Sequence, residues 1–130
     1  MASLNFKGKS AVWNHHLSVP YHTLEKDGKK SLKGNDNTDN LIIEGDNLLA
    51  LKALLPKYQD SIKCIYIDPP YNTGSAFEHY NDSVEHSLWL SLMRDRLAIL
   101  KRLLREDGFI FVQIDNNEMG FLSIFSGMRV

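Results

Sequence analysis

A short apolar run, Ile62–Ile67, ends abruptly in a carboxylate, two prolines and a tyrosine. Its apolar residues are mostly β-branched or aromatic, which is typical of a strand buried on both faces of a parallel sheet. Proline has no N–H to donate to a sheet ladder, so we expect the strand to end at Asp68. Asp68 and Tyr71 would then lie at the carboxyl end of a parallel strand, where open α/β sheets bind ligands. The sequence therefore predicts an α/β fold with a site at this edge.

The rest of the sequence alternates between short apolar runs and helical patterns. Leu41–Glu44 is typical of a short strand, and Leu48–Leu55 carries leucines on one helical face. A long helix is predicted over Ser87–Glu106, with Gly108 in the left-handed position after it. Phe109–Ile114 is predicted as another strand buried on both faces. This order predicts three parallel strands joined by right-handed helical crossovers.

Composition limits the class of protein. The 130 residues have the size of one domain, and 43% hydrophobic and 24% charged residues are globular values. No apolar run approaches the ~20 residues of a membrane span. The single cysteine, Cys64, falls in the central predicted strand, so we expect it to be packed inside a protein of the reducing cytoplasm. Because the net charge is −1, any DNA contact must come from local basic patches.

Two groups of polar residues have less specific interpretations. Residues 1–40 are mixed in charge and predict an N-terminal arm and linker. The arm's histidines, including His15 and His16, lack cysteine or acidic partners at zinc spacing, so we expect no metal site. Trp13 is expected to dock the arm on the domain. The arginines of the long helix, such as Arg94, form either a solvated face or a patch that contacts phosphates.

The residues after the central strand carry a family resemblance. Asp68-Pro69-Pro70-Tyr71 resembles the Asp-Pro-Pro-Tyr motif of methyltransferases that modify exocyclic amino groups of nucleobases. With Asn72-Thr73-Gly74 it is similar to adenine-specific DNA methyltransferases, above all the modification (Mod) subunits of type III restriction-modification systems. Ser87–Leu97 and Asp115–Glu118 also resemble segments of these subunits. The resemblance covers about residues 41–118 and implies a partial, truncated Rossmann-like methyltransferase fold.

This resemblance implies methyl transfer from S-adenosyl-L-methionine to the amino group of an adenine flipped out of double-stranded DNA. That amino group is a poor nucleophile because its lone pair is delocalised into the ring. The Asp68 carboxylate and the Pro69 carbonyl could accept its two hydrogens, while Pro69 and Pro70 stiffen the turn. Tyr71 would stack on the base, which contributes roughly 1–3 kcal/mol. The alternative is a turn aspartate beside a packing tyrosine.

Asp46 has two interpretations that can both hold. It precedes the predicted helix at Leu48 and is a good N-cap, worth about 0.5–2 kcal/mol. In the methyltransferase family that the Asp68–Tyr71 motif resembles, a Gly-Asp pair one strand before the motif contacts the adenine of the cofactor. The resemblance therefore implies that Asp46, together with Asp68, binds S-adenosyl-L-methionine.

One element of the family pattern is absent from residues 1–130: the glycine-rich Phe-x-Gly-x-Gly turn that cradles the cofactor. We therefore expect residues 41–118 to be a partial catalytic domain, residues 119–130 a divergent tail of a truncated chain, and the isolated chain to be inactive. The resemblance implies a restriction (nuclease/helicase) subunit and a Mod homodimer as partners in the full-length protein. Two alternatives stay open: an RNA or protein amino-methyltransferase, and a non-catalytic or partner-binding fragment.

Overall fold

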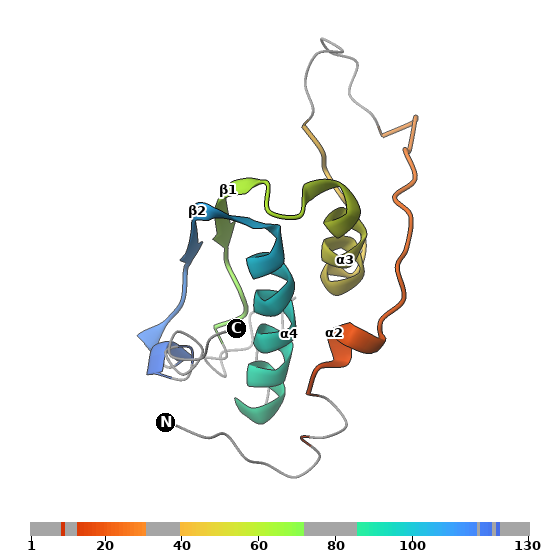
Figure 1. Cartoon of the computed structure of the whole chain (residues 1–130). Helices are drawn as coiled ribbons and strands as arrows, with labels where there is room; N and C mark the ends of the chain where they lie inside the picture. The colour runs from red at the N-terminus through yellow and green to blue at the C-terminus, as the bar shows by residue number, and fades with distance from the viewer. Residues whose placement is uncertain are drawn as a thin grey trace.

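The computed structural model describes residues 9, 13–30, 40–71, 86–116, 118–120 and 122. Their elements are α2 (His15–Ser18), α3 (Asn47–Tyr58), β1 (Ile62–Ile67), α4 (His86–Leu103) and β2 (Leu104–Val112). The strands β1 and β2 pair in parallel, and α4 lies between this sheet and α3 (Figure 1). Both strands run opposite to α3 and α4, so the carboxyl ends of the strands and the beginnings of both helices lie at the same end of the domain (Figure 1).

The predicted α/β class and parallel sheet are confirmed, but among the described residues the sheet has two strands in place of the three predicted. Leu41–Glu44, predicted as a strand, is extended chain without a place in the sheet. Ile42 is 96% exposed, so the apolar character that predicted this strand is not satisfied by burial. A strand requires a partner ladder for its N–H and C=O groups, and the described sheet offers this segment none. Among the described residues, no helix combines the length and the apolar character needed to cross a membrane.

The helix α3 begins where the sequence predicts and continues past its predicted end. Asp46 is its N-cap, and Oδ1 of this side chain accepts from Leu48 N at 2.9 Å and Leu49 N at 3.2 Å. Pro56 lies inside the helix, which continues to Tyr58. A proline in the last turn removes a single helical hydrogen bond, a smaller disruption than in mid-helix.

The boundary between α4 and β2 corrects the prediction around Gly108. The helix ends at Leu103, and β2 starts at Leu104, so the predicted helix end and strand start both lie too late. Gly108 lies inside the strand. A Cβ atom there would approach the Leu104 side chain to 2.9 Å and the Ile62 carbonyl oxygen to 3.0 Å. Glycine is required at this position by close packing within the sheet, in place of the left-handed helix end that was predicted.

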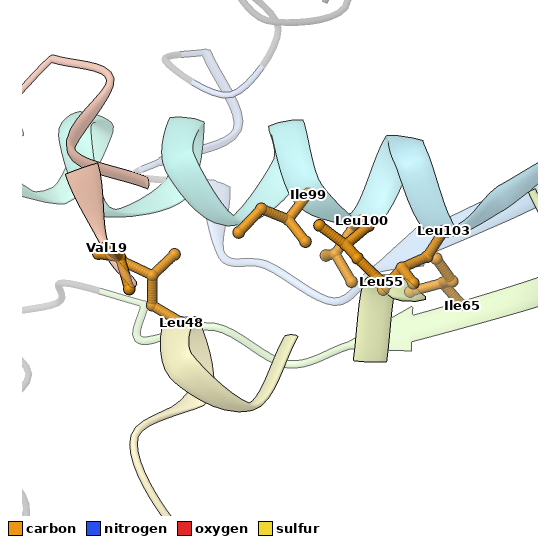
Figure 2. Close-up of a cluster of buried hydrophobic side chains, with 7 residues drawn as sticks. All are labelled: Val19, Leu48, Leu55, Ile65, Ile99, Leu100 and Leu103. Atoms are coloured by element: carbon orange, nitrogen blue, oxygen red, sulfur yellow. The ribbon is translucent and has the colours of Figure 1, made fainter. Parts of the chain in front are cut away.

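The hydrophobic core lies between α4, α3 and β1. Figure 2 shows its buried side chains in a row along α4. They are Val19, Leu48, Leu55, Ile65, Ile99, Leu100 and Leu103. The amphipathic spacing that predicted α3 and α4 therefore identifies the apolar faces with which these two helices pack in the core.

The sheet is covered on one face by described residues, which corrects the prediction of strands buried on both faces. Ile65 is the buried residue of β1, whereas Cys64 is exposed and Tyr66 is 63% exposed. The neighbouring Phe109 and Phe111 of β2 are also about half exposed, at 47% and 53%. Both helices that pack against the sheet lie on the Ile65 side. The packing role predicted for Cys64 is therefore wrong for this structure.

Replacing Ile99 by alanine tests the core. Ile99 is 1% exposed, so Ile99→Ala should lower the free energy of unfolding by about 2–5 kcal/mol. The variant loses the burial of the deleted methyl and methylene groups, and the cavity that remains lowers the stability further. Leu88 on the same helix is 50% exposed, so Leu88→Ala should cost well under half as much. Urea denaturation followed by circular dichroism measures both. Equal losses for the two variants would contradict the core described here.

Candidate active site

The turn Asp68–Tyr71 leaves the sheet at the carboxyl end of β1, as the sequence predicts. Asp68 is exposed, while the two prolines and Tyr71 are partly buried. The end of β2 lies beside this turn, because the Gln113 backbone N–H donates to the Ile67 carbonyl at 2.9 Å. The chain segments after both strands therefore meet at one edge of the sheet.

Trp89 of α4 holds the turn in place by a hydrogen bond. Its indole Nε1 donates to the Pro70 carbonyl at 2.8 Å, and its side chain is 1% exposed. The ring packs in a second apolar cluster with Leu90 and Met93, against which Ile67 is also packed. A buried indole N–H needs a partner, and here that partner fixes the second proline of the turn. The sequence placed Trp89 in a segment with family resemblance but did not predict this contact.

Hydrogen bonds connect the side chains at this edge into a chain. Gln113 Nε2 donates to the Tyr71 hydroxyl at 2.7 Å, and the Tyr66 hydroxyl donates to Gln113 Oε1. Asp68 raises the pKa of Tyr71 above its ordinary value of 10.0, chiefly as a hydrogen-bond acceptor for the Tyr71 hydroxyl and also by its charge. The structure thus brings the predicted residues Asp68 and Tyr71 into direct contact and adds Gln113, which sequence reasoning missed. The one indication of Gln113 in the sequence was that it is a polar residue near the end of the predicted apolar strand Phe109–Ile114.

Asp46 is the N-cap of α3, and the start of this helix lies at the same end of the domain as the carboxyl end of β1 (Figure 1). The predicted N-cap role is confirmed. Both capping bonds use Oδ1, and no described residue donates a hydrogen bond to the other carboxylate oxygen. Arg96 lies nearby: its Nε donates to Asn47 Oδ1 at 2.7 Å. Burial lowers the pKa of Arg96, and the Asp46 carboxylate opposes that shift. The cofactor role of Asp46 stays a prediction.

The N-terminal arm docks on the domain by polar contacts. Asp95 is 4% exposed, and its Oδ1 lies 2.7 Å from His16 Nδ1. Lys52 is also buried and donates to the backbone carbonyls of His16, at 2.7 Å, and Val19. The predicted docking of Trp13 is confirmed by the Arg94 guanidinium, which lies 4.3 Å from its ring centroid. In the part of the chain that the structure describes, no three metal-ligating side chains gather.

Comparison with known proteins assigns a class. Residues 62–127 match the model of the DNA methylase family. This match contains β1, the Asp68–Tyr71 turn, α4 and β2. The chain belongs to this family of enzymes.

Individual relatives define the similarity further. The chain is 48% identical over 104 residues to the probable type III restriction-modification enzyme HindVI Mod subunit of Haemophilus influenzae. It is 36% identical over 154 residues to the type III restriction-modification enzyme EcoP15I Mod subunit of Escherichia coli. It is 35% identical over 111 residues to the type II methyltransferase M.KpnI of Klebsiella pneumoniae. The predicted resemblance to type III Mod subunits is confirmed.

These matches cover much of this chain and a small part of each relative. They include 75%, 94% and 79% of the chain, but 14%, 24% and 27% of the HindVI, EcoP15I and KpnI proteins. The motif extension Asn72-Thr73-Gly74 lies outside the described residues.

Replacing Asp68 by asparagine tests its contact with Tyr71. The neutral phenol donates to a carboxylate, so Asp68→Asn should lower the pKa of Tyr71 toward 10.0. For the same reason, the stabilisation from this contact in the parent chain should be present at neutral pH and lost as the pH rises through the folded-state pKa. Nuclear magnetic resonance of tyrosines labelled at Cζ measures the titration, with Tyr71→Phe to assign the signal.

Asp60 provides the matched control for this change. It is an exposed aspartate in the turn between α3 and β1, and this turn lies at the opposite end of the domain from the carboxyl end of β1 (Figure 1). Its backbone φ is 52°, a conformation that asparagine tolerates well, so Asp60→Asn should fold normally. Asp60→Asn should leave the pKa of Tyr71 unchanged. A pKa that does not respond to Asp68→Asn either would refute the contact.

Proposed function

We propose that this chain is the catalytic-motif part of an S-adenosyl-L-methionine-dependent DNA methyltransferase that modifies the exocyclic amino group of adenine. In this proposal it belongs to the modification subunit of a type III restriction-modification system. The observation that carries the proposal is the position of Asp68, in a proline-stiffened turn at the carboxyl edge of a parallel sheet and in contact with Tyr71. Family membership and the similarity to the HindVI and EcoP15I Mod subunits support it.

The turn suits the chemical requirement of the reaction, which is to make a weakly nucleophilic amine attack a methyl group. The Asp68 carboxylate accepts one amino hydrogen and the Pro69 carbonyl the other, which favours tetrahedral geometry at the nitrogen. The Pro70 carbonyl accepts from Trp89 and so holds the turn in place. Acceptors fixed before the substrate arrives need no reorganisation during the reaction. Asp68 would hold its hydrogen bond through the transfer, and the proton that the amine loses would pass late through this carboxylate to solvent, to which Asp68 is exposed.

Tyr71 is proposed to stack on the adenine after it leaves the duplex. Flipping costs a few kcal/mol, and stacking on an aromatic ring returns roughly 1–3 kcal/mol. The hydroxyl of Tyr71 is held between Gln113 and Asp68, so the ring has a defined orientation. An oriented ring loses less side-chain entropy when the base binds.

The cofactor would supply an electrophilic methyl group on its sulfonium. Asp46 and Asp68 are the residues proposed to bind it. Asp46 fits this role because it is exposed, because both capping bonds use Oδ1, and because the start of α3 lies at the same end of the domain as the carboxyl end of β1 (Figure 1). Asp46 would accept from the adenine amino group of the cofactor.

The remaining parts of the proposal concern the full-length protein. The two-stranded sheet would be part of a larger Rossmann-like methyltransferase sheet, with residues 41–118 as the catalytic-motif segment and residues 1–40 as a docked arm. Double-stranded DNA would be the substrate. A restriction subunit and a second Mod copy would be the partners, in the cytoplasm. Because the chain spans 14–27% of the relatives compared, these assignments rest on the family.

The proposal is tested in a chimera, in which residues 41–118 replace the matching segment of the HindVI Mod subunit. This exchange is feasible because the two sequences are 48% identical over their alignment. Asp68→Ala in the chimera should reduce methyl transfer at least about a hundredfold, because removing a preorganised transition-state acceptor typically costs this much. DNA binding should be retained. Transfer of a tritiated methyl group to DNA measures the first property and gel-shift the second.

The controls separate this role from general damage. Asp60→Asn, far from the site, should leave methylation unchanged. Full methylation by the Asp68→Ala chimera would end the assignment. Methylation of RNA or protein in place of DNA would favour the amino-methyltransferase alternative, and a chimera that binds DNA without methylating it would favour a non-catalytic segment.

Asp46 variants test whether one carboxylate both caps α3 and binds the cofactor. Asp46→Ala should lower the free energy of unfolding of the chain by about 0.5–2 kcal/mol, whereas Asp46→Asn keeps a capping oxygen and should stay near the parent. In the chimera, Asp46→Asn should weaken S-adenosyl-L-methionine binding by roughly tenfold, because a hydrogen bond to a charged acceptor is stronger than one to an amide. Urea denaturation and calorimetry measure the two effects. Unchanged cofactor affinity in Asp46→Asn would leave capping as the role of this residue.

A further inference from the structure

Gln113 is a polar residue at the end of the sheet, next to the proposed site. It follows the last residue of β2, Val112, and its backbone N–H extends the ladder by donating to the Ile67 carbonyl at 2.9 Å. Ile67 is the residue before Asp68. The backbone bond therefore fixes Gln113 opposite the start of the catalytic turn.

The side-chain amide of Gln113 makes one hydrogen bond through each of its polar atoms. Oε1 accepts from the Tyr66 hydroxyl, and Nε2 donates to the Tyr71 hydroxyl at 2.7 Å. An amide nitrogen has no capacity to accept, so the Tyr71 oxygen must be the acceptor in this bond. The Tyr71 proton is then directed away from Gln113, toward the partner on its other side. That partner is the carboxylate of Asp68.

All donors in this chain thus point the same way, from Tyr66 through Gln113 and Tyr71 to Asp68. A carboxylate has two oxygens and about four acceptor positions. One bond from Tyr71 restricts the rotation of the Asp68 side chain and leaves acceptor positions for an incoming amine. The same bond fixes the tyrosine ring, which the Gln113 amide holds from the neighbouring strand.

We propose that Gln113 is a positioning residue of the methyltransferase site, which orients Tyr71 and, through its hydroxyl, Asp68. The inference rests on the proposed function, because Asp68 and Tyr71 are the groups assigned there to the substrate. Gln113 itself touches neither reacting atom in this proposal. Its contribution is to set the direction of one proton and the angle of one ring.

The electrostatics of Tyr71 agree with this geometry and provide a readout. Asp68 raises the pKa of Tyr71, and the hydrogen bond from Gln113 lowers it, because an N–H donor stabilises the phenolate. Tyr66 also faces Tyr71 and raises its pKa by charge repulsion. Loss of the Gln113 donor should therefore raise the pKa of Tyr71, whereas a residue with a purely space-filling role would leave it unchanged.

The first experiment measures this pKa in the 130-residue chain. Gln113→Glu keeps the shape of the side chain but removes its donor, and Gln113→Met removes both polar atoms. Both variants should raise the pKa of Tyr71, and Gln113→Glu should raise it more because it adds a negative charge. Gln59→Glu is the matched control, with the same change of charge on an exposed glutamine that follows α3. The Tyr71 signal is followed by nuclear magnetic resonance and assigned with Tyr71→Phe.

The second experiment measures methyl transfer in the HindVI chimera. Gln113→Met should lower kcat by about three- to tenfold, the effect of one hydrogen bond that orients a reacting group. KM for S-adenosyl-L-methionine should stay unchanged, because Gln113 is not proposed to touch the cofactor. Gln59→Met should leave both constants at the parent values. A melting temperature within a few degrees of the parent shows that the variants are folded.

The outcomes separate the two proposals. A raised pKa of Tyr71 together with a lower kcat supports the positioning role. An unchanged pKa in both Gln113 variants overturns it, and so does a parent-like kcat in Gln113→Met. A parent chimera without methyl transfer counts against the proposed function, and the titration in the 130-residue chain then decides alone whether Gln113 orients Tyr71.

Discussion

The parallel pairing of β1 with β2 is the constraint on which the site depends. Parallel strands run in the same direction, so their carboxyl ends meet although α4 separates them in sequence. The register continues one residue past β2, where Gln113 N–H donates to the Ile67 carbonyl. Asp68 and Gln113 are adjacent because of this bond. A slip of the register by one residue would turn the Gln113 side chain to the other face and remove it from Tyr71.

The packing of α4 also supports the carboxyl edge of the sheet, where the Asp68–Tyr71 turn lies. The helix supplies Ile99, Leu100 and Leu103 to the main core and Trp89 to the second cluster. A single helix therefore holds both the body of the sheet and the turn that leaves it, through Trp89 and the Pro70 carbonyl. Since Trp89 connects helix and turn, the geometry of the turn at Asp68 is linked to the packing of α4. The contact with Trp89 therefore helps to hold the turn in one shape although Asp68 itself is exposed.

The sequence predicted those features that follow from local pattern. The end of β1 at Asp68, the cap at Asp46 and the apolar face of α4 depend on neighbouring residues, and all three are confirmed. Features that depend on distant residues were missed or wrong. Leu41–Glu44 has the pattern of a strand but no partner in the described sheet, and Gly108 serves close packing against Ile62. Gln113 could not be assigned because its partners, Tyr66 and Tyr71, come from β1 and the turn after it, which are distant in sequence.

The way in which Lys52 holds the arm has a consequence for sequence divergence. This lysine binds the main-chain carbonyls of His16 and Val19, groups that every amino acid possesses. Many side chains of the arm can therefore be substituted without loss of these two hydrogen bonds, provided that the backbone of the arm keeps its path along α3. Because the arm is attached through main-chain oxygens, its side chains can change without loss of these hydrogen bonds. A substitution of Lys52, in contrast, would remove them.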